Sequence, residues 1–431
     1  MHPISQQRKG PTVERLNAVL SPWQEGWLDL HHINTGRGDA ALYVLPDGTT
    51  VGVDCGELDP TSPRTNSPRN APARPNGGRP PYEWVARYMG RRAAERGVAP
   101  SLDYALVTHF HDDHMGALHR KSRRARHGAY SRTGITGLGD LVPIGTLIDR
   151  GWPGYDFPAS FEGELVQAVV AERPHLAPAV AEYQRTMRNY LEFIATQQAE
   201  RGMRVEQLAV GRSDQIVPLH KPGVYPVEVR GVAANGRVWT GQGSEVQALL
   251  PPAEELGPYA LRIENVCSAA FSIRYGPFHF FNGGDIVGLV ELDDPPWFDV
   301  ETPVARAVGP TDVQVLNHHG YRNTHHEFWV RTTRPRVLVH QNWSSDQPGM
   351  GVLKRITSTY LYPGPRDLFG LDILPVNHAF IGEAIDRAYK STRGHVVVRV
   401  EPGGARYWVI VLDDTTESDR VTGVYGPYAS R

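Results

Sequence analysis

Three histidines and two aspartates lie within the six residues that begin at His109. The stretch reads His109-Phe110-His111-Asp112-Asp113-His114, which places ligand-type side chains at i, i+2, i+4 and i+5. Imidazole and carboxylate together suit Zn²⁺, and also Mn²⁺ or Fe, better than Ca²⁺, which prefers oxygen ligands only. The alternative is a polar turn that is rich in histidine by chance, but such a ligand pattern is rare without a metal. The stretch therefore predicts a transition-metal site.

The residues before this motif must position it. The run from Leu102 to Val107 is apolar and predicts a buried strand that ends where the ligands begin. His109 and His111 keep the two-residue period of a strand, so both can point the same way. Asp113 and His114 fall in the following turn and can face back across the same space. We therefore expect two metal positions close together.

The run from His109 to His114 matches the HxHxDH signature of the metallo-β-lactamase superfamily, which this chain resembles. The resemblance implies an α/β fold, the αββα sandwich of two mixed β-sheets flanked by helices. Two turns ahead of the signature are similar to those of a ComEC-like soluble metallo-hydrolase subgroup. They are Gly36-Arg37-Gly38-Asp39, before a predicted hairpin, and Asp54-Cys55-Gly56, after it. Glycines there permit tight turns and close backbone approach.

The same resemblance implies the remaining ligands. His109, His111, Asp113 and His114 would bind metal, and Asp285 of Gly283-Gly284-Asp285 would bridge both ions with one oxygen to each. Asn317-His318-His319-Gly320 resembles the family's His-His-Gly motif. One of His318 and His319 would complete the second metal position, and the other would contact the substrate's oxyanion. The sequence leaves open which histidine does which, while Asp113 would orient the nucleophilic water.

Four further residues would support the ligands from behind by hydrogen bonds: Asp39, Asp54, Asn265 and Ser268. For Asp54 the alternative is a plain turn aspartate. Many superfamily members also supply another histidine to the first metal, between the signature and the bridging aspartate. None of the histidines available here follows a predicted strand end: His119, His127, His175, His220 and His279. The third protein ligand of the first metal therefore stays open.

Candidate substrate contacts follow a predicted strand that begins at Ile144, because the equivalent family strand ends beside the metals. They are Asp149, Arg150 and Tyr155, with His378 on a later loop as a fourth candidate. Structural pairing of Asp149 and Arg150 with their neighbours is the alternative. The basic run from His119 to His127 would either steer a phosphate-bearing substrate or form a solvated helix face and loop.

We expect a polar N-terminal arm over residues 1–20 and one catalytic domain over 21–431, with a loop insertion at 59–82 and a helical insertion at about 155–205. The helical insertion would wall one side of the active site. Periodicity predicts strands over 27–33, 42–45, 50–53, 102–107, 225–230, 246–250, 267–275, 278–282, 313–316 and 335–340, helices over 82–96, 162–201 and 351–357, and a hairpin of 394–400 and 406–412 that completes the second sheet.

Composition describes an ordinary globular protein, with 40% hydrophobic residues, 21% charged residues and a net charge of −2. This balance argues against a long nucleic acid as partner. Cys55 and Cys267 form no CxxC motif, so we expect free thiols. There is no apolar run long enough to predict a membrane span, and the first ten residues are too polar for a signal peptide. We expect a cytoplasmic protein, or a periplasmic or secreted one if a signal peptide has been removed.

The expected function is metal-dependent hydrolysis of a small molecule. Two Zn²⁺ ions, with Mn²⁺ or Fe as alternatives, would lower the pKa of a shared water to about 7. The family resemblance favours a phosphodiester substrate. Carboxyl-ester, lactone or β-lactam hydrolysis on the same site is a second enzymatic hypothesis, and a metal-stabilised binding module without turnover is a third. The sequence has no Gly-x-Ser-x-Gly, P-loop or dinucleotide motif, so serine hydrolases, kinases and dehydrogenases lack support.

Overall fold

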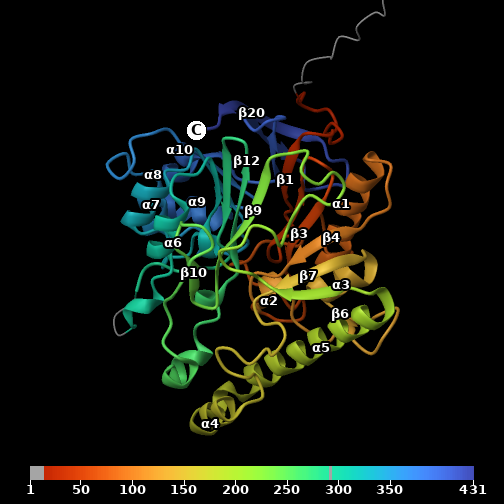
Figure 1. The fold of residues 1–431 in the computed structure, drawn as a ribbon, viewed down its shortest axis with the longest axis vertical. Coiled ribbons are helices and arrows are strands. Elements are labelled where there is room, and N and C mark those ends of the chain that lie inside the picture. The colour runs from red at the N-terminus through yellow and green to blue at the C-terminus, as the bar shows by residue number, and fades with distance from the viewer. Residues whose placement is uncertain (1–13, 291–293) are drawn as a thin grey trace, which may run out of the picture.

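Two nine-stranded β-sheets dominate the computed structural model, which describes residues 14–290 and 294–431 (Figure 1). The first sheet has the order β20-β19-β18-β1-β2-β3-β4-β7-β8 and the second β11-β10-β9-β12-β13-β14-β15-β16-β17. The strands of the first are β1 Leu28–His32, β2 Ala40–Val44, β3 Thr50–Cys55, β4 Leu102–Leu106, β7 Ile144–Asp149, β8 Arg204–Gln207, β18 His395–Val400, β19 Arg406–Leu412 and β20 Val421–Ala429. Those of the second are β9 Val227–Ala234, β10 Arg237–Trp239, β11 Val246–Ala248, β12 Ala270–Tyr275, β13 Phe278–Asn282, β14 Val313–Val315, β15 Val337–His340, β16 Asp367–Gly370 and β17 Tyr389–Ser391.

Each sheet has a parallel half and an antiparallel half. In the first sheet β3, β4, β7 and β8 run parallel, and in the second β13 to β17 do. Ligands of α/β proteins bind beyond the carboxyl ends of such parallel strands. The residues after β4, β13 and β14 are the predicted metal ligands, so both parallel halves contribute to one site.

Helices cover both outer faces (Figure 1). Helices α1, α3 and α5 pack on the first sheet, and α6, α7, α8 and α10 on the second. The helices are α1 Pro81–Glu95, α2 Asp112–Met115, α3 Gly134–Leu141, α4 Glu164–Glu172, α5 Ala177–Arg201, α6 Glu301–Val308, α7 Glu327–Thr333, α8 Met350–Thr357, α9 Pro375–Ile381 and α10 Glu383–Ala388. This four-layer arrangement confirms the predicted αββα sandwich.

The central core lies between the sheets and follows from alternation along the strands. In β18, Val396, Val398 and Val400 face the second sheet, whereas Val397 packs against the outer helical layer. Burying each such side chain contributes roughly 1.5–3 kcal/mol. Because successive side chains of a strand point to opposite faces, a run that is apolar throughout serves two layers at once.

Three predicted elements differ from the structure. The hairpin of β18 and β19 joins the first sheet rather than the second, because β18 pairs with β1. The helix predicted over 162–201 is divided into α4 and α5 by a turn at Pro174–Leu176, where proline cannot continue the hydrogen-bond ladder. The basic run is no helix: it contains β5 Arg123–Arg124, which pairs with β6 Ser131–Arg132.

The N-terminal arm lies partly outside the described residues, which begin at Glu14. From Glu14 onward, the arm contacts the predicted catalytic domain. Val19 forms a bridge with Arg420, Leu20 is buried, and a Glu14 carboxylate oxygen lies 2.5 Å from the Arg399 guanidinium. Within the two described ranges, no helix has the length and apolarity needed to cross a membrane.

Candidate metal centre

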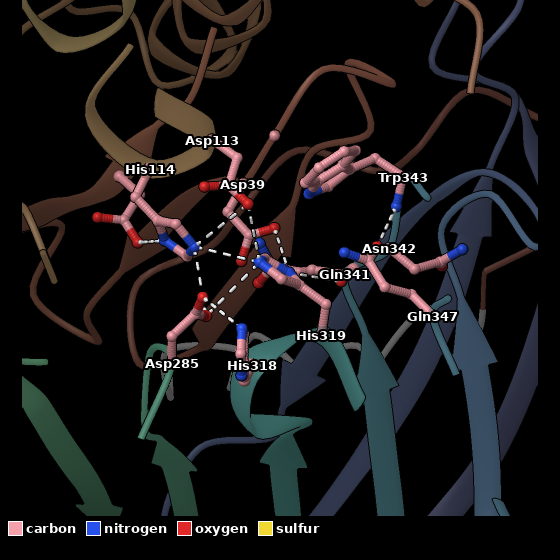
Figure 2. A network of polar contacts seen from close by, with 12 residues as sticks. Asp39, Asp113, His114, Asp285, His318, His319, Gln341, Asn342, Trp343 and Gln347 are labelled. Carbon is pink, nitrogen blue, oxygen red and sulfur yellow. Dashed lines mark hydrogen bonds and ion pairs between the residues drawn. The ribbon is translucent and has the colours of Figure 1, made fainter. Parts of the chain in front are cut away.

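The predicted ligands meet in two groups of donor atoms that share Asp285. Figure 2 shows Asp285 beside Asp113, His114, His318 and His319. The first donor group is His109, His111 and Asp285. The second donor group is Asp113, His114, Asp285 and His319. Within each group the donor atoms lie within 4.8 Å of one another. The structure therefore brings together seven predicted residues when His318, which lies beside Asp285, is included.

The second donor group has the dimensions of a tetrahedral metal site. Nε2 of His319 lies 3.1 Å from Oδ2 of Asp113, 3.2 Å from Nε2 of His114 and 3.5 Å from Oδ1 of Asp285. His114 Nε2 lies 3.3 Å from the same Asp285 oxygen. Ligands about 2.0–2.1 Å from a tetrahedral zinc ion are separated by roughly 3.3 Å. His114 Nε2 lies farther from Asp113 Oδ2, at 3.9 Å, so the four atoms form a slightly expanded site for a zinc-sized ion.

When these histidines are neutral, the hydrogen bonds behind them leave the inner nitrogens without protons. His114 donates from Nδ1 to Asp54, at 2.9 Å, and His319 from Nδ1 to the Gln341 carbonyl oxygen, at 3.1 Å. In a neutral imidazole the other nitrogen then carries a lone pair. Two lone pairs thus face each other across 3.2 Å, beside two carboxylates. Only a cation or added protons can satisfy this arrangement.

The first donor group is more open. His109 Nε2 lies 3.0 Å from His111 Nδ1 and 3.6 Å from Oδ2 of Asp285. Oδ2 thus faces the first donor group, while Oδ1 faces His114 and His319. None of the five histidines considered for the third position joins this group. His119 instead pairs with Glu57, and His279 with the Pro310 carbonyl.

His318 occupies the open side of the first donor group. Its Nε2 lies 3.8 Å from Oδ2 of Asp285 (Figure 2). Nδ1 donates to Asn323 Oδ1 at 2.9 Å, and the Asn265 amide donates to Nε2 at 3.0 Å. The structure therefore assigns the two histidines different places: His319 belongs to the second donor group, and His318 lies beside the first, with its Nε2 accepting the Asn265 N–H.

The carboxylates and histidines of the site shift one another's pKa strongly. Burial alone would raise the pKa of Asp285, but His319, His114, His318 and His109 outweigh it and hold that pKa well below its usual range. Burial lowers the pKa of His319, yet Asp285 and Asp39 raise it well above the ordinary value. Without a metal, protons on histidine balance the carboxylates. A divalent ion would supply the same positive charge.

All four predicted supporting residues contact the ligands or their backbone. Asp54 bonds His114 and also accepts from the Thr108 N–H and hydroxyl, at 2.7 and 2.8 Å. Asp39 lies 3.3 Å from His319 Nδ1, Asn265 bonds His318, and Ser268 Oγ accepts from the Asp285 N–H. These contacts fix ring orientation and tautomer, as supporting residues of metal sites do.

The backbone around the site requires glycine at two positions and has positive φ angles at three others. A Cβ on Gly38 or Gly56 would lie 2.4 or 1.9 Å from the Asp113 carbonyl oxygen, so only glycine permits this close approach. Asp54, His318 and His319 have positive φ angles of 54°, 48° and 51°. Such angles are uncommon outside glycine and cluster at functional sites.

Two connected cavities lie over the donor atoms. The aromatic lobe, about 500 Å³, is bounded by Phe110, Tyr183 and Trp343 together with Leu58 and Glu182. The metal lobe, about 420 Å³, contains Asp113, Asp285, His318 and His319 among its lining residues. Both lobes share the residues Arg64, Asn70, His111, Asp112 and Trp343. Residues of the loop within 59–82 line both lobes, and residues of α5 line the aromatic lobe.

The predicted substrate contacts lie elsewhere. Asp149 is fully buried and accepts from the N–H groups of Gly151 and Trp152 and from the hydroxyls of Tyr155 and Tyr190. Arg150 is buried against Glu264, with Nε 2.7 Å from Oε1. His378, on α9, lies 3.5 Å from Asp386. None of these residues lines either lobe, and the contacts of Asp149 and Arg150 match the alternative of structural pairing with their neighbours.

Sequence reasoning missed two residues near the centre. Glu264 accepts from the Phe110 N–H at 2.8 Å while it pairs with Arg150, and so it supports the peptide between His109 and His111. Arg64 lines both lobes from the insertion loop. Glu264 stands directly before Asn265, a position that suggests a role only once the fold is known. Arg64 carries no local signal beyond its charge.

No model of a known protein family matches the chain, and no curated protein matches it in sequence. Solved structures resemble it in shape. A protein from Parabacteroides distasonis ATCC 8503 named a metal-dependent hydrolase is 12% identical, with a TM-score of 0.32 over 76% of this chain and 88% of its own. The metallo-β-lactamase fold protein YhfI from Bacillus subtilis is 9% identical, with a TM-score of 0.35 over 79% of this chain and 96% of its own.

A further match is Zn²⁺-bound PqqB from Methylobacterium extorquens, which is 13% identical, with a TM-score of 0.31 over 83% of this chain and 86% of its own. At such identities and scores these matches carry no weight for the function of this chain. The αββα sandwich follows from its own two sheets and helical layers. The ComEC-like subgroup stays a prediction.

Proposed function

We propose that this protein is a metal-dependent hydrolase that cleaves a small phosphodiester with two transition-metal ions, zinc being the first choice. One observation carries the proposal. The two oxygens of Asp285 face different donor groups, Oδ1 toward His114 and His319 and Oδ2 toward His109 and His318. Paired metal sites suit phosphodiesters because they can stabilise both the attacking and the leaving oxygen.

The bound ions would supply a water of lowered pKa and polarise the scissile group. The chain's own residues supply the rest. Asp113 Oδ2, 3.1 Å from His319 Nε2, is placed to orient the attacking water at the second donor group. His318 keeps Nε2 unprotonated, because burial lowers its pKa and Asn323 accepts from Nδ1. This nitrogen accepts the Asn265 N–H, so it is not suited to donate to an oxyanion, and it would bind metal or accept a proton by giving up that hydrogen bond.

A second enzymatic hypothesis is hydrolysis of a carboxyl ester, lactone or β-lactam, because the same donor set could activate water against a carbonyl carbon. A third, from another class, is a binding module that metal stabilises without turnover. The two lobes favour turnover, since they would offer a substrate space next to the residues that would hold the ions.

The test is hydrolysis by zinc-loaded protein of bis(p-nitrophenyl) phosphate, p-nitrophenyl acetate and a lactone. We expect turnover of the diester that is lost in Asp285→Asn and retained in His378→Ala, a histidine outside the site. Turnover of the ester or lactone alone would support the second hypothesis. If metal binds and stabilises the fold but none of the substrates is cleaved, the binding module would replace the hydrolase.

A further inference from the structure

The insertion loop places one cation over both lobes of the cleft. Arg64 is exposed and lines both the aromatic lobe and the metal lobe, and its charge partly opposes the rise in the pKa of Asp112 that burial and Asp113 cause. Among the described residues its guanidinium has neither a hydrogen bond nor an ion pair, although the cleft around it is rich in acceptors. Other arginines of the loop are paired: Arg74 with Asp372, and Arg79 with Glu83.

The loop around Arg64 is anchored on both sides. Arg37 Nη1 donates to the carbonyl oxygens of Thr65 and Ala71, at 2.9 and 2.8 Å. The Asn70 amide donates to the Arg64 carbonyl oxygen at 3.0 Å, and the Ala71 N–H to that of Trp343 at 2.7 Å. These bonds pre-organise the backbone, so binding through Arg64 needs little ordering of the loop.

The surrounding acids do not satisfy this cation. Asp59 accepts from Thr61, Asp112 accepts from the Asp113 N–H, and Asp346 lies 3.8 Å from Arg69. Asp113 and Asp285 belong to the donor groups. Among the residues described, Arg64 is the one arginine or lysine that lines both lobes, and a guanidinium fits the two oxygens of a phosphate or carboxylate.

We propose that Arg64 binds the negatively charged group of the substrate and thereby selects an anionic diester over neutral esters. This inference rests on the proposed function and specifies its substrate class. The anionic phosphate lies at the junction of the two lobes, within reach of the guanidinium and the donor groups. An apolar or ring-bearing substituent occupies the aromatic lobe, against Leu58, Phe110 and Tyr183.

The experiment compares wild type, Arg64→Gln, Arg64→Lys and the matched control Arg79→Gln, which changes a loop arginine outside the cleft. For bis(p-nitrophenyl) phosphate, Arg64→Gln is expected to raise KM about tenfold, the loss typical of one charge-assisted hydrogen bond. For the neutral p-nitrophenyl acetate, KM should stay within about twofold. Arg64→Lys should recover part of the loss because the charge remains.

A binding measurement separates this inference from the proposed function. Calorimetric titration of zinc-loaded protein with diphenyl phosphate requires no turnover. About tenfold weaker binding in Arg64→Gln, with Arg79→Gln unchanged, would support the anion contact even if no substrate were cleaved. Unchanged binding or KM in Arg64→Gln, an equal loss on the neutral ester, or no binding of diphenyl phosphate to wild type would overturn it.

Discussion

Two buried polar clusters lie at the ends of neighbouring strands, β4 and β7, and they differ in one respect. Asp149, the last residue of β7, accepts four hydrogen bonds from N–H and O–H donors at 2.8–2.9 Å. Asp285 faces four histidine nitrogens at 3.3–3.8 Å, and the tautomers of His114 and His319 direct lone pairs toward it. In the first cluster, protein N–H and O–H groups satisfy the carboxylate. The second needs added protons or a metal cation to balance its carboxylates, which makes it the candidate functional cluster.

The largest expected effect comes from Asp285→Asn. An amide cannot give one anionic oxygen to each donor group, so both metal positions weaken. We expect at least about a 10³-fold loss in kcat/KM and loss of bound metal. Metal content by mass spectrometry and thermal unfolding check this. The metal-free variant should unfold at about the temperature of metal-free wild type, and full activity in the variant would remove our assignment of the site.

Substitutions of the two adjacent histidines should have different effects, and these rank second in size. His319→Ala removes a member of the second donor group, and we expect loss of one metal equivalent and about 100-fold or more in activity. His318→Ala should lose less metal because that residue lies outside the second donor group. The metal stoichiometry of both variants shows which histidine is a metal ligand. Equal retention of metal in both would show that the motif has been misread.

Asp149→Asn tests the hydrogen-bonded cluster around Asp149. The amide nitrogen cannot accept from the N–H or O–H groups that it would face, so buried donors lose their partners. We expect a fall of roughly 2–4 kcal/mol in the free energy of unfolding, with metal content unchanged. Denaturant unfolding measures the first and mass spectrometry the second. Asp156→Asn, an exposed aspartate of the same loop, serves as the control. Metal loss in Asp149→Asn would contradict a purely structural role for the Asp149 cluster.

A third buried carboxylate supports the Asn317-His318-His319 turn and should make a smaller, pH-dependent contribution. Glu301 accepts from the Asn317 amide at 2.7 Å and the His325 N–H at 2.8 Å, yet burial raises its pKa from 4.5 to about 7. Between these pH values the folded state holds a proton that the unfolded state has lost. The free energy of unfolding should therefore fall as pH rises through this window.

Glu301→Gln removes this titration. From about pH 5 to pH 8, the wild-type free energy of unfolding should decline by roughly 2–3 kcal/mol more than that of the variant. Denaturant unfolding at both pH values measures the difference. Parallel pH profiles for the two proteins would mean that Glu301 stays ionised across the window, with its charge balanced by the N–H donors around it.

Local patterns predicted the ligands of the first motif and most strands, whereas the sandwich and the remaining ligands followed from the family resemblance of those motifs. His109 to His114 lie within six residues, and the apolar strands carry their own period. Contacts between distant residues were not predictable. Tyr190, on α5, closes the Asp149 cluster, and β18 pairs with β1 across most of the chain. The roles of His318 and His319 depend on positive φ angles that no residue-type pattern signals.

The measurement that tests the central claim most directly is the metal content of purified, zinc-reconstituted protein, compared between wild type and Asp285→Asn. A shared, bridging Asp285 predicts close to two transition-metal equivalents per chain in wild type and a large loss in the variant. No metal in wild type even after reconstitution, or the same content in both proteins, would contradict a binuclear centre built on Asp285.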